Sequence, residues 1–290
     1  MTFETTFRPP LPYSLARSAF SPLDLTQRFS GGILELALDT AEGPARAKVW
    51  QNKDATLGAV IDAEHPEAAV DRLRFLLALD VDLAPFYAMV AGDRLLGPAV
   101  ARARGLRSLR VGTAAHALLR GVTGQLVRTR DARAMEAAVL RRCARRHHTF
   151  WLAPTQAELL TVSVPHLEQA GLAARRAAAL VRALRSIDLE ALAELPTDAV
   201  VSRISAIPWL GPWTAGSVAI EGLGRLDAGM VADLGHVKLL TIELGRVPTH
   251  EESAELLDRF APYQALASLY LHLVPGSRIP ASPGVVARRS

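Results

Sequence analysis

The chain has 290 residues, of which 50% are hydrophobic and 21% are charged, and its formal net charge is +4 at pH 7. This composition supplies a substantial core, which excludes wholesale disorder, and the mild positive charge is compatible with a polyanionic partner. The single cysteine, Cys143, excludes an intramolecular disulfide and any four-cysteine zinc or iron–sulfur site.

No part of the sequence indicates a membrane or secretory protein. The chain lacks the run of about 18 apolar residues that a spanning helix needs. Its first ten residues, MTFETTFRPP, do not have the pattern of a signal peptide. We therefore expect a soluble protein of the bacterial cytoplasm that has no membrane partner.

Short stretches of alternating hydrophobicity occupy the first part of the chain. They lie at 31–40, 45–51 and 56–63, and Gly, Asp and Pro residues separate them. Alternation places every second side chain on one face, so these stretches predict antiparallel strands with one face on a core. The next stretch, 65–80, changes to helical spacing, because Ala69, Leu73, Leu76 and Leu77 share one helical face.

The rest of the chain predicts one helix after another. Thr113 is a predicted N-cap for a helix over 113–129. Further helices are predicted over 131–148, 155–160, 174–186, 188–195, 197–206, 250–260 and 261–273. We therefore expect an α+β fold, with a small N-terminal mixed sheet domain over 1–78 and a mainly α-helical domain over 79–290.

The segment 204–220, ISAIPWLGPWTAGSVAI, contains a helix break followed at once by a new helix. Pro212 is suited to the first helical position, where its missing N–H would have no partner. The other first-turn N–H groups and the helix dipole form an anion site, and Gly211 lets a phosphate approach the backbone closely. The alternative is a tight helix–helix connection that binds no ligand.

This segment resembles the helix-hairpin-helix element of the DNA glycosylase superfamily, and its ending GPWTA resembles the 3-methyladenine DNA glycosylase II branch. Other stretches resemble segments of that branch in the same order, at 82–107, 118–127, 167–184 and 222–240, within a total span of 80–275. The resemblance implies a helix-hairpin-helix glycosylase fold with its hairpin at about 198–222.

A duplex hides the N-glycosidic bond, so such an enzyme flips the nucleotide out and fills the gap that it leaves. The resemblance implies that Leu126 is the wedge, with Gln125 beside it. The alternative for Leu126 is a core leucine of an amphipathic helix. The resemblance also implies DNA contacts from four residues of the hairpin, namely Ile207, Trp209, Gly211 and Thr214.

The position that matches the family's catalytic aspartate is Asp233. Cleavage of the glycosidic bond builds positive charge on the sugar, and a carboxylate near C1′ stabilises that charge and can activate a water. Asp233 is also a predicted N-cap for a helix that begins at Leu234. The two roles are compatible, because the N–H donors hold the carboxylate rigid and ionised. The nearby Asp227 fits the family spacing less well.

Alkylated purines such as 3-methyladenine and 7-methylguanine are cationic, so an aromatic surface holds them by stacking and cation–π attraction. The resemblance implies that Trp213 supplies this surface; the alternative is a buried helix tryptophan. The other predicted base-pocket residues are Ser217, His272 and Phe20, and the first two stand where the family has aromatic residues. Trp213 also stands where bifunctional members carry the Schiff-base lysine, so hydrolysis without a lyase step is implied.

Three features depart from the family pattern or stay outside the predicted site. Trp209 replaces the first glycine of the hairpin, and a bulky side chain there restricts φ and crowds the phosphate approach. His236, in the helix after Asp233, is expected on the protein surface. The basic residues between 141 and 148 are expected to form a solvated helix end.

The resulting hypothesis is a monofunctional DNA glycosylase that excises alkylated bases from double-stranded DNA during base excision repair and acts as a monomer. The resemblance implies no metal and no required cofactor, and it leaves open a monovalent cation at the hairpin that bridges to a DNA phosphate. One alternative is a degenerate family member that binds distorted or damaged DNA without excision. Another is a helical interaction scaffold with no DNA role.

Overall fold

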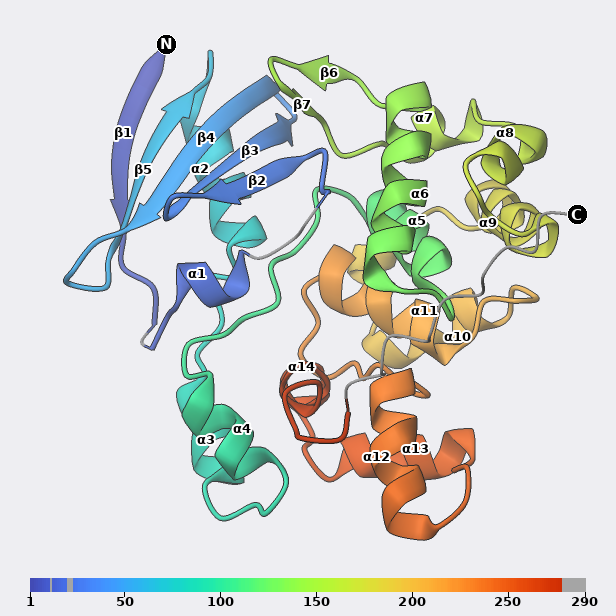
Figure 1. Ribbon diagram of the computed structural model, residues 1–290. Helices are drawn as coiled ribbons and strands as arrows, with labels where there is room; N and C mark the ends of the chain where they lie inside the picture. The colour runs from blue at the N-terminus through green and yellow to red at the C-terminus, as the bar shows by residue number, and fades with distance from the viewer. Residues whose placement is uncertain (11, 20–22, 278–290) are drawn as a thin grey trace, which may run out of the picture.

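The computed structural model describes residues 1–10, 12–19 and 23–277. A sheet built from the first part of the chain lies beside a larger body of helices built from the rest (Figure 1). This arrangement confirms the predicted α+β fold.

Five strands form the sheet in the order β1-β5-β4-β3-β2, and every pairing is antiparallel, so the sheet is not mixed. The strands are β1 (Thr2–Phe7), β2 (Gln27–Ser30), β3 (Ile33–Thr40), β4 (Gly43–Gln51) and β5 (Leu57–Asp62). The three central strands are the predicted ones. The sequence did not predict the edge strands β1 and β2, because most of their side chains are exposed or half-buried and lack clear apolar alternation.

The sheet and one helix form the N-terminal core. Leu34, Leu36 and Leu38 of β3 are buried on the same face, since side chains two residues apart in a strand point the same way. Helix α2 (Pro66–Leu76) packs against this core, and a short helix α1 (Leu15–Ser18) precedes β2. The residues predicted to share a helical face all lie in this core: Ala69, Leu73, Leu76 and Leu77.

The helical body starts with α3 (Ala84–Val90), α4 (Leu96–Arg102), α5 (Ala114–Gly124) and α6 (Thr129–Cys143). Two paired short strands, β6 (Arg146–His147) and β7 (Phe150–Trp151), precede α7 (Gln156–Leu160), α8 (Val164–Gln169) and α9 (Ala174–Ser186). The chain continues with α10 (Thr197–Ser205), α11 (Pro212–Ser217), α12 (Leu234–Leu244), α13 (His250–Asp258) and α14 (Gln264–Leu271). Within the described ranges, every helix falls short of the length and apolarity that a bilayer span requires.

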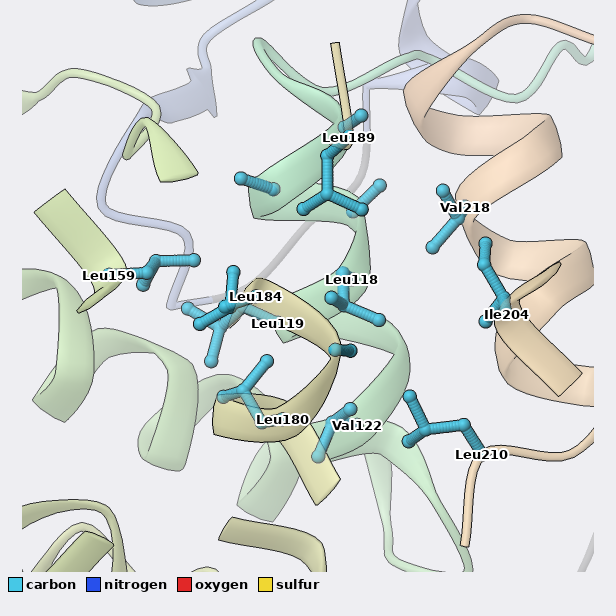
Figure 2. Packing of buried hydrophobic residues seen from close by; sticks show 14 of the residues in the cluster. Leu118, Leu119, Val122, Leu159, Leu180, Leu184, Leu189, Ile204, Leu210 and Val218 are labelled. Carbon is cyan, nitrogen blue, oxygen red and sulfur yellow. The ribbon is translucent and has the colours of Figure 1, made fainter. Parts of the chain in front are cut away.

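Helix α5 lies at the centre of the helical core. Thr113 accepts a hydrogen bond from the His116 N–H and caps α5, as predicted. Figure 2 shows the side chains that meet around this helix, with labels on Leu118, Leu119, Val122, Leu159, Leu180, Leu184, Leu189, Ile204, Leu210 and Val218. Because α10 contacts α11 and α11 contacts α5, the predicted hairpin rests on a buried scaffold.

Two predicted helices are shorter than expected. The helix that Thr113 caps ends at Gly124 instead of continuing to 129, and Gln125 leaves the helix with a ψ of 116°. The segment 188–195 contains only a 3-10 helix, η1 (Ala191–Glu194). After Gly124, Leu126 and Val127 continue the apolar pattern although the helix has ended.

The basic residues between 141 and 148 are mostly exposed, as predicted, but only Arg141 and Arg142 belong to the end of a helix. Helix α6 ends at Cys143, and residues 146–147 form β6. Arg145 forms ion pairs with Asp39 of β3 and Glu158 of α7. These tertiary contacts draw the chain away from the helix axis towards the sheet.

A buried ionic cluster connects the segment before β2 to α5 and α6. Arg120 Nη2 lies 2.8 Å from both Glu136 Oε1 and Asp24 Oδ2. His116 Nε2 lies 2.7 Å from the same Glu136 oxygen. Burial opposes ionisation of Glu136, but the Arg120 guanidinium beside it holds the pKa of this carboxyl well below its usual range. Glu136 is therefore ionised, and the Arg120 guanidinium compensates its charge.

Candidate active site

The segment predicted as a hairpin folds as two helices joined by a tight turn. Helix α10 ends at Ser205, and the Leu210 N–H donates to the Ile207 carbonyl at 3.0 Å across the turn. Gly211 is the extended N-cap of α11, and Pro212 occupies the first helical position. The predicted break and restart are both confirmed.

Trp209 occupies a backbone conformation that favours glycine. Its φ is +74°, in the left-handed region, which is strained for a tryptophan. Its side chain is 61% exposed, and the Arg175 guanidinium carbon lies 4.8 Å from the ring centre. The turn thus presents an aromatic ring and a positive charge on its surface, and the sequence did not indicate Arg175 as part of this surface.

Gln125 ties the end of α5 to the hairpin. Its Nε2 donates to the Trp209 carbonyl at 3.0 Å and to Thr214 Oγ1 at 2.8 Å. Thr214 is buried, and Ile207 is partly buried against the helical core. At Gly211, by contrast, an added Cβ would meet no atom of the described residues within 4 Å. The open part of the hairpin is therefore around Trp209 and Gly211.

Leu126 lies in the turn between α5 and α6, directly after Gln125. Its φ is +53°, and the residue is 73% exposed. The alternative of a core leucine inside a helix is therefore wrong. A wedge requires an apolar side chain that projects into solvent beside the hairpin, as Leu126 does. The wedge role itself stays a prediction.

Asp233 connects the hairpin to α12. Its Oδ1 accepts a hydrogen bond from the Gly235 N–H at 2.8 Å, so the predicted N-cap is confirmed. Its Oδ2 accepts a hydrogen bond from Trp213 Nε1 at 2.9 Å. The residue is 9% exposed. The predicted catalytic carboxylate therefore lies against the second helix of the hairpin, held by two donors.

Trp213 lies between the end of α5 and Asp233. The indole is partly buried, and a Cβ added at Gly124 would lie 2.8 Å from its Cη2 atom. The absence of a side chain at Gly124 therefore creates the space that the ring occupies. Because the ring nitrogen donates to Asp233, Trp213 orients the carboxylate in addition to offering an aromatic surface.

Two histidines lie beside the carboxylate. The surface position predicted for one of them, His236, is wrong. His272, at the end of α14, has its Nε2 3.7 Å from Asp233 Oδ1, and its side chain is 46% exposed. His236, expected on the surface, is fully buried because this side of α12 packs on α14, and its Nε2 lies 3.1 Å from the Ser268 carbonyl oxygen. The two rings are 5.1 Å apart.

Burial sets the charge state of His236. It lowers the pKa of the imidazole, while the Asp233 carboxylate and the Ser268 and Met230 carbonyls act in the opposite direction and His272 adds to the decrease. The ring is therefore neutral at pH 7. Its position three residues after Asp233, on the same side of the first helical turn, was the one sequence signal for this placement.

The remaining predicted pocket residues are Ser217 and Phe20. Ser217 is buried, and a Cβ added at Gly121 of α5 would lie 3.4 Å from its Cβ. Phe20 lies outside the described residues. Tyr13, in the segment before Phe20, is buried in the N-terminal core, and its hydroxyl donates to the Leu77 carbonyl at 3.1 Å.

Two small cavities lie away from Asp233. One lies between the sheet and α2, and the other lies beside Arg107 and Leu226. Asp233 lines neither of them. The candidate site is therefore defined by the contacts of Asp233 with Trp213 and His272 and not by an enclosed cavity.

Comparisons with known proteins identify relatives in sequence and in fold. No protein-family model matches the chain. The probable bifunctional transcriptional activator/DNA repair enzyme AlkA of Mycobacterium tuberculosis is 30% identical over 211 residues, which cover 70% of this chain and 42% of that protein. The chain thus spans less than half the length of this curated relative.

Solved structures share the fold at low sequence identity. The 3-methyladenine DNA-glycosylase from Archaeoglobus fulgidus has a TM-score of 0.78 and 20% identity, over 93% of this chain and 97% of that one. A Clostridium acetobutylicum 8-oxoguanine glycosylase/lyase in complex with double-stranded DNA has a TM-score of 0.75 and 16% identity, over 94% of this chain and 96% of that one.

Proposed function

We propose that this chain, which resembles helix-hairpin-helix DNA glycosylases in sequence and in fold, is a member of that superfamily and excises alkylated bases from double-stranded DNA. The proposed substrates are of the 3-methyladenine and 7-methylguanine class, which the 3-methyladenine DNA glycosylase II branch handles. The reaction is hydrolysis of the N-glycosidic bond in base excision repair.

The observation that carries this proposal is the hydrogen bond between Trp213 Nε1 and Asp233 Oδ2. It joins a carboxylate that is 9% exposed to the helix that begins at the hairpin turn. A fixed carboxylate in a poorly solvated place stabilises developing positive charge better than one in water, because it needs no reorganisation. Asp233 would face C1′ of a flipped nucleotide and orient the attacking water.

Base recognition is proposed to use Trp213 and the half-exposed His272. A cationic alkylated purine is attracted to the face of an indole. It also has a weak glycosidic bond, so no general acid is needed to protonate it. His272 replaces an aromatic residue of the family and makes this side of the site more polar.

A monofunctional reaction without a cofactor is part of the proposal. A tryptophan, Trp213, stands at the position of the Schiff-base lysine of bifunctional members, so no amine is available there to form the covalent intermediate. At the hairpin, the open backbone around Gly211 is proposed to contact a DNA phosphate, directly or through a monovalent cation. The protein is proposed to act as a monomer.

A base-release assay tests this function. Purified protein is expected to release 7-methylguanine and 3-methyladenine from methylated DNA, and hypoxanthine, ethenoadenine and 1-methyladenine complete the panel. The DNA strand should break only after alkali treatment, since water attack leaves an intact abasic site. Strand breakage without alkali would contradict the monofunctional reaction. Tight binding of lesion DNA without release would favour the alternative of a degenerate, binding-only member.

Replacing Leu126 with alanine is expected to slow excision from duplex DNA roughly tenfold, because one contact that substitutes for base stacking is worth about 1 to 3 kcal/mol. Excision from a single-stranded substrate should change little, since no stack has to be refilled. Single-turnover rates on both substrates measure the effect. Leu160→Ala, at another exposed leucine, is the matched control. An equal loss on both substrates would exclude a wedge.

A further inference from the structure

Three potential metal ligands converge at the start of α12. One ligand atom from each of Asp233, His236 and His272 lies within 4.8 Å of the other two. Asp233 Oδ1 lies 3.7 Å from His272 Nε2. Two of these residues belong to the first turn of α12, and the third ends α14, so the cluster exists only in the folded chain.

His236 contributes a buried nitrogen, Nδ1, that makes no hydrogen bond to the described residues. Its Nε2 lies 3.1 Å from the Ser268 carbonyl oxygen, and a carbonyl oxygen only accepts hydrogen bonds, so Nε2 carries the proton of the neutral ring. The lone pair is then on Nδ1, which is buried and has no hydrogen-bond partner among the described residues. Buried polar atoms are rarely left unpaired in proteins, so this nitrogen points to a ligand.

The surroundings resemble those of metal ligands in general. Histidine ligands usually donate their second nitrogen to a carbonyl or carboxylate, as His236 does to Ser268. Ligating carboxylates are usually held by further donors, as Asp233 is by the Gly235 N–H and Trp213 Nε1. The ligand atoms of a tetrahedral zinc ion lie about 3.4 Å apart. The recorded 3.7 Å separation is close to this value.

Space and solvent access also fit an ion. A Cβ added at Gly235 would lie 3.1 Å from both Asp233 Oδ1 and His272 Nδ1, so the glycine keeps this side of the cluster open. The His272 side chain is 46% exposed, so the site can be reached from solvent and the ring can adjust its position. Two imidazoles and one carboxylate suit a borderline-soft dication.

We propose that Asp233, His236 and His272 bind a divalent transition-metal ion such as Zn²⁺. Water would be the fourth ligand of the ion. An ion held there takes the lone pairs of the carboxylate that the excision reaction would use. Metal binding and base excision therefore exclude each other, so a bound ion inhibits base excision reversibly. This last consequence depends on the proposed function, whereas the binding of the metal does not.

Metal binding is tested on the full chain without DNA. After treatment with a chelator and its removal, calorimetric titration with Zn²⁺ is expected to show one ion per chain, and Co²⁺ should give the visible absorption of a four-coordinate site. His272→Ala should weaken binding at least about tenfold, since even second-sphere changes have effects of that size. This side chain is half-exposed, so circular dichroism should confirm an unchanged fold. Asp233→Asn should weaken binding as well.

A surface pair of histidines provides the matched control. The rings of His147 and His148 lie 4.4 Å apart on the β6 side of the molecule and could hold an ion by themselves. His148→Gln should leave Zn²⁺ affinity unchanged. The proposal is overturned if wild-type protein binds no Zn²⁺, if His272→Ala binds it equally well, or if His148→Gln abolishes binding.

Activity separates this inference from the proposed function. Zn²⁺ should suppress base release, and a chelator should restore it. A chain that releases bases but binds no metal would overturn only the metal site. A chain that binds Zn²⁺ through His272 but releases no base would keep the site and overturn the glycosylase function.

Discussion

The substitution Asp233→Asn is expected to abolish base release while leaving DNA binding intact. The carboxylate supplies the negative charge that stabilises the sugar cation, and asparagine has nearly the same shape without that charge. Loss of one preorganised electrostatic contact lowers a rate by about 100- to 1000-fold, and loss of water activation adds to this. Release of 7-methylguanine from methylated DNA and a DNA-binding titration measure the two effects.

The fold should survive this change. Asparagine is as good an N-cap as aspartate, so its side-chain oxygen can still accept from the Gly235 N–H. Asp227→Asn is the matched control, because Asp227 is also close to the hairpin but is exposed and accepts from Thr197 Oγ1. Full activity of Asp233→Asn would refute the site assignment. Loss of DNA binding together with activity would show that the substitution had altered more than the charge.

The substitution Glu136→Ala is expected to lower the free energy of unfolding by about 3 to 5 kcal/mol, because it leaves a buried charge without its main partner. Glu136 lies 2.8 Å from Arg120 and 2.7 Å from His116, and both of these side chains are buried. Arg120 would keep Asp24 as a partner, but it would lose the Glu136 carboxylate, and the His116 ring would lose the same partner. The midpoint of urea unfolding measures the change.

An exposed ion pair serves as the control for this stability effect. Arg246 pairs with Glu252 at the surface beside α13, and its side chain is 57% exposed. Exposed pairs contribute about 0 to 1 kcal/mol, so Arg246→Ala should shift the unfolding midpoint little. Equal losses for Glu136→Ala and Arg246→Ala would mean that burial does not set the energy of the Glu136 cluster.

Local features of the site could be predicted because their signals are short-range. The Gly211-Pro212 pair predicted the restart of the hairpin, and Asp233 before Leu234 predicted the cap of α12; both are confirmed. Caps and first-turn prolines depend on the geometry of a few successive residues, which is the same in most contexts. The three central strands were predicted for a similar reason, since alternation directly reports a half-buried face.

The positions that were wrong depend on contacts between distant segments. His236 was placed at the surface because its neighbours in sequence do not reveal that α14 covers this side of α12. Leu126 appeared to continue a helix, but Gln125 ends it by donating to Trp209 and Thr214. The exposure of Leu126 follows from that turn.

The sequence alone therefore indicated the fold class, the hairpin and Asp233 as the candidate carboxylate, because hydrophobic period, capping residues and family motifs depend on consecutive residues. Only the tertiary structure decided that Trp213 holds Asp233, that two histidines flank it and that one of them is buried with an unpaired nitrogen. These contacts join residues of α11, α12 and α14. The distances between the residues depend on how the helices pack, which no local sequence pattern specifies.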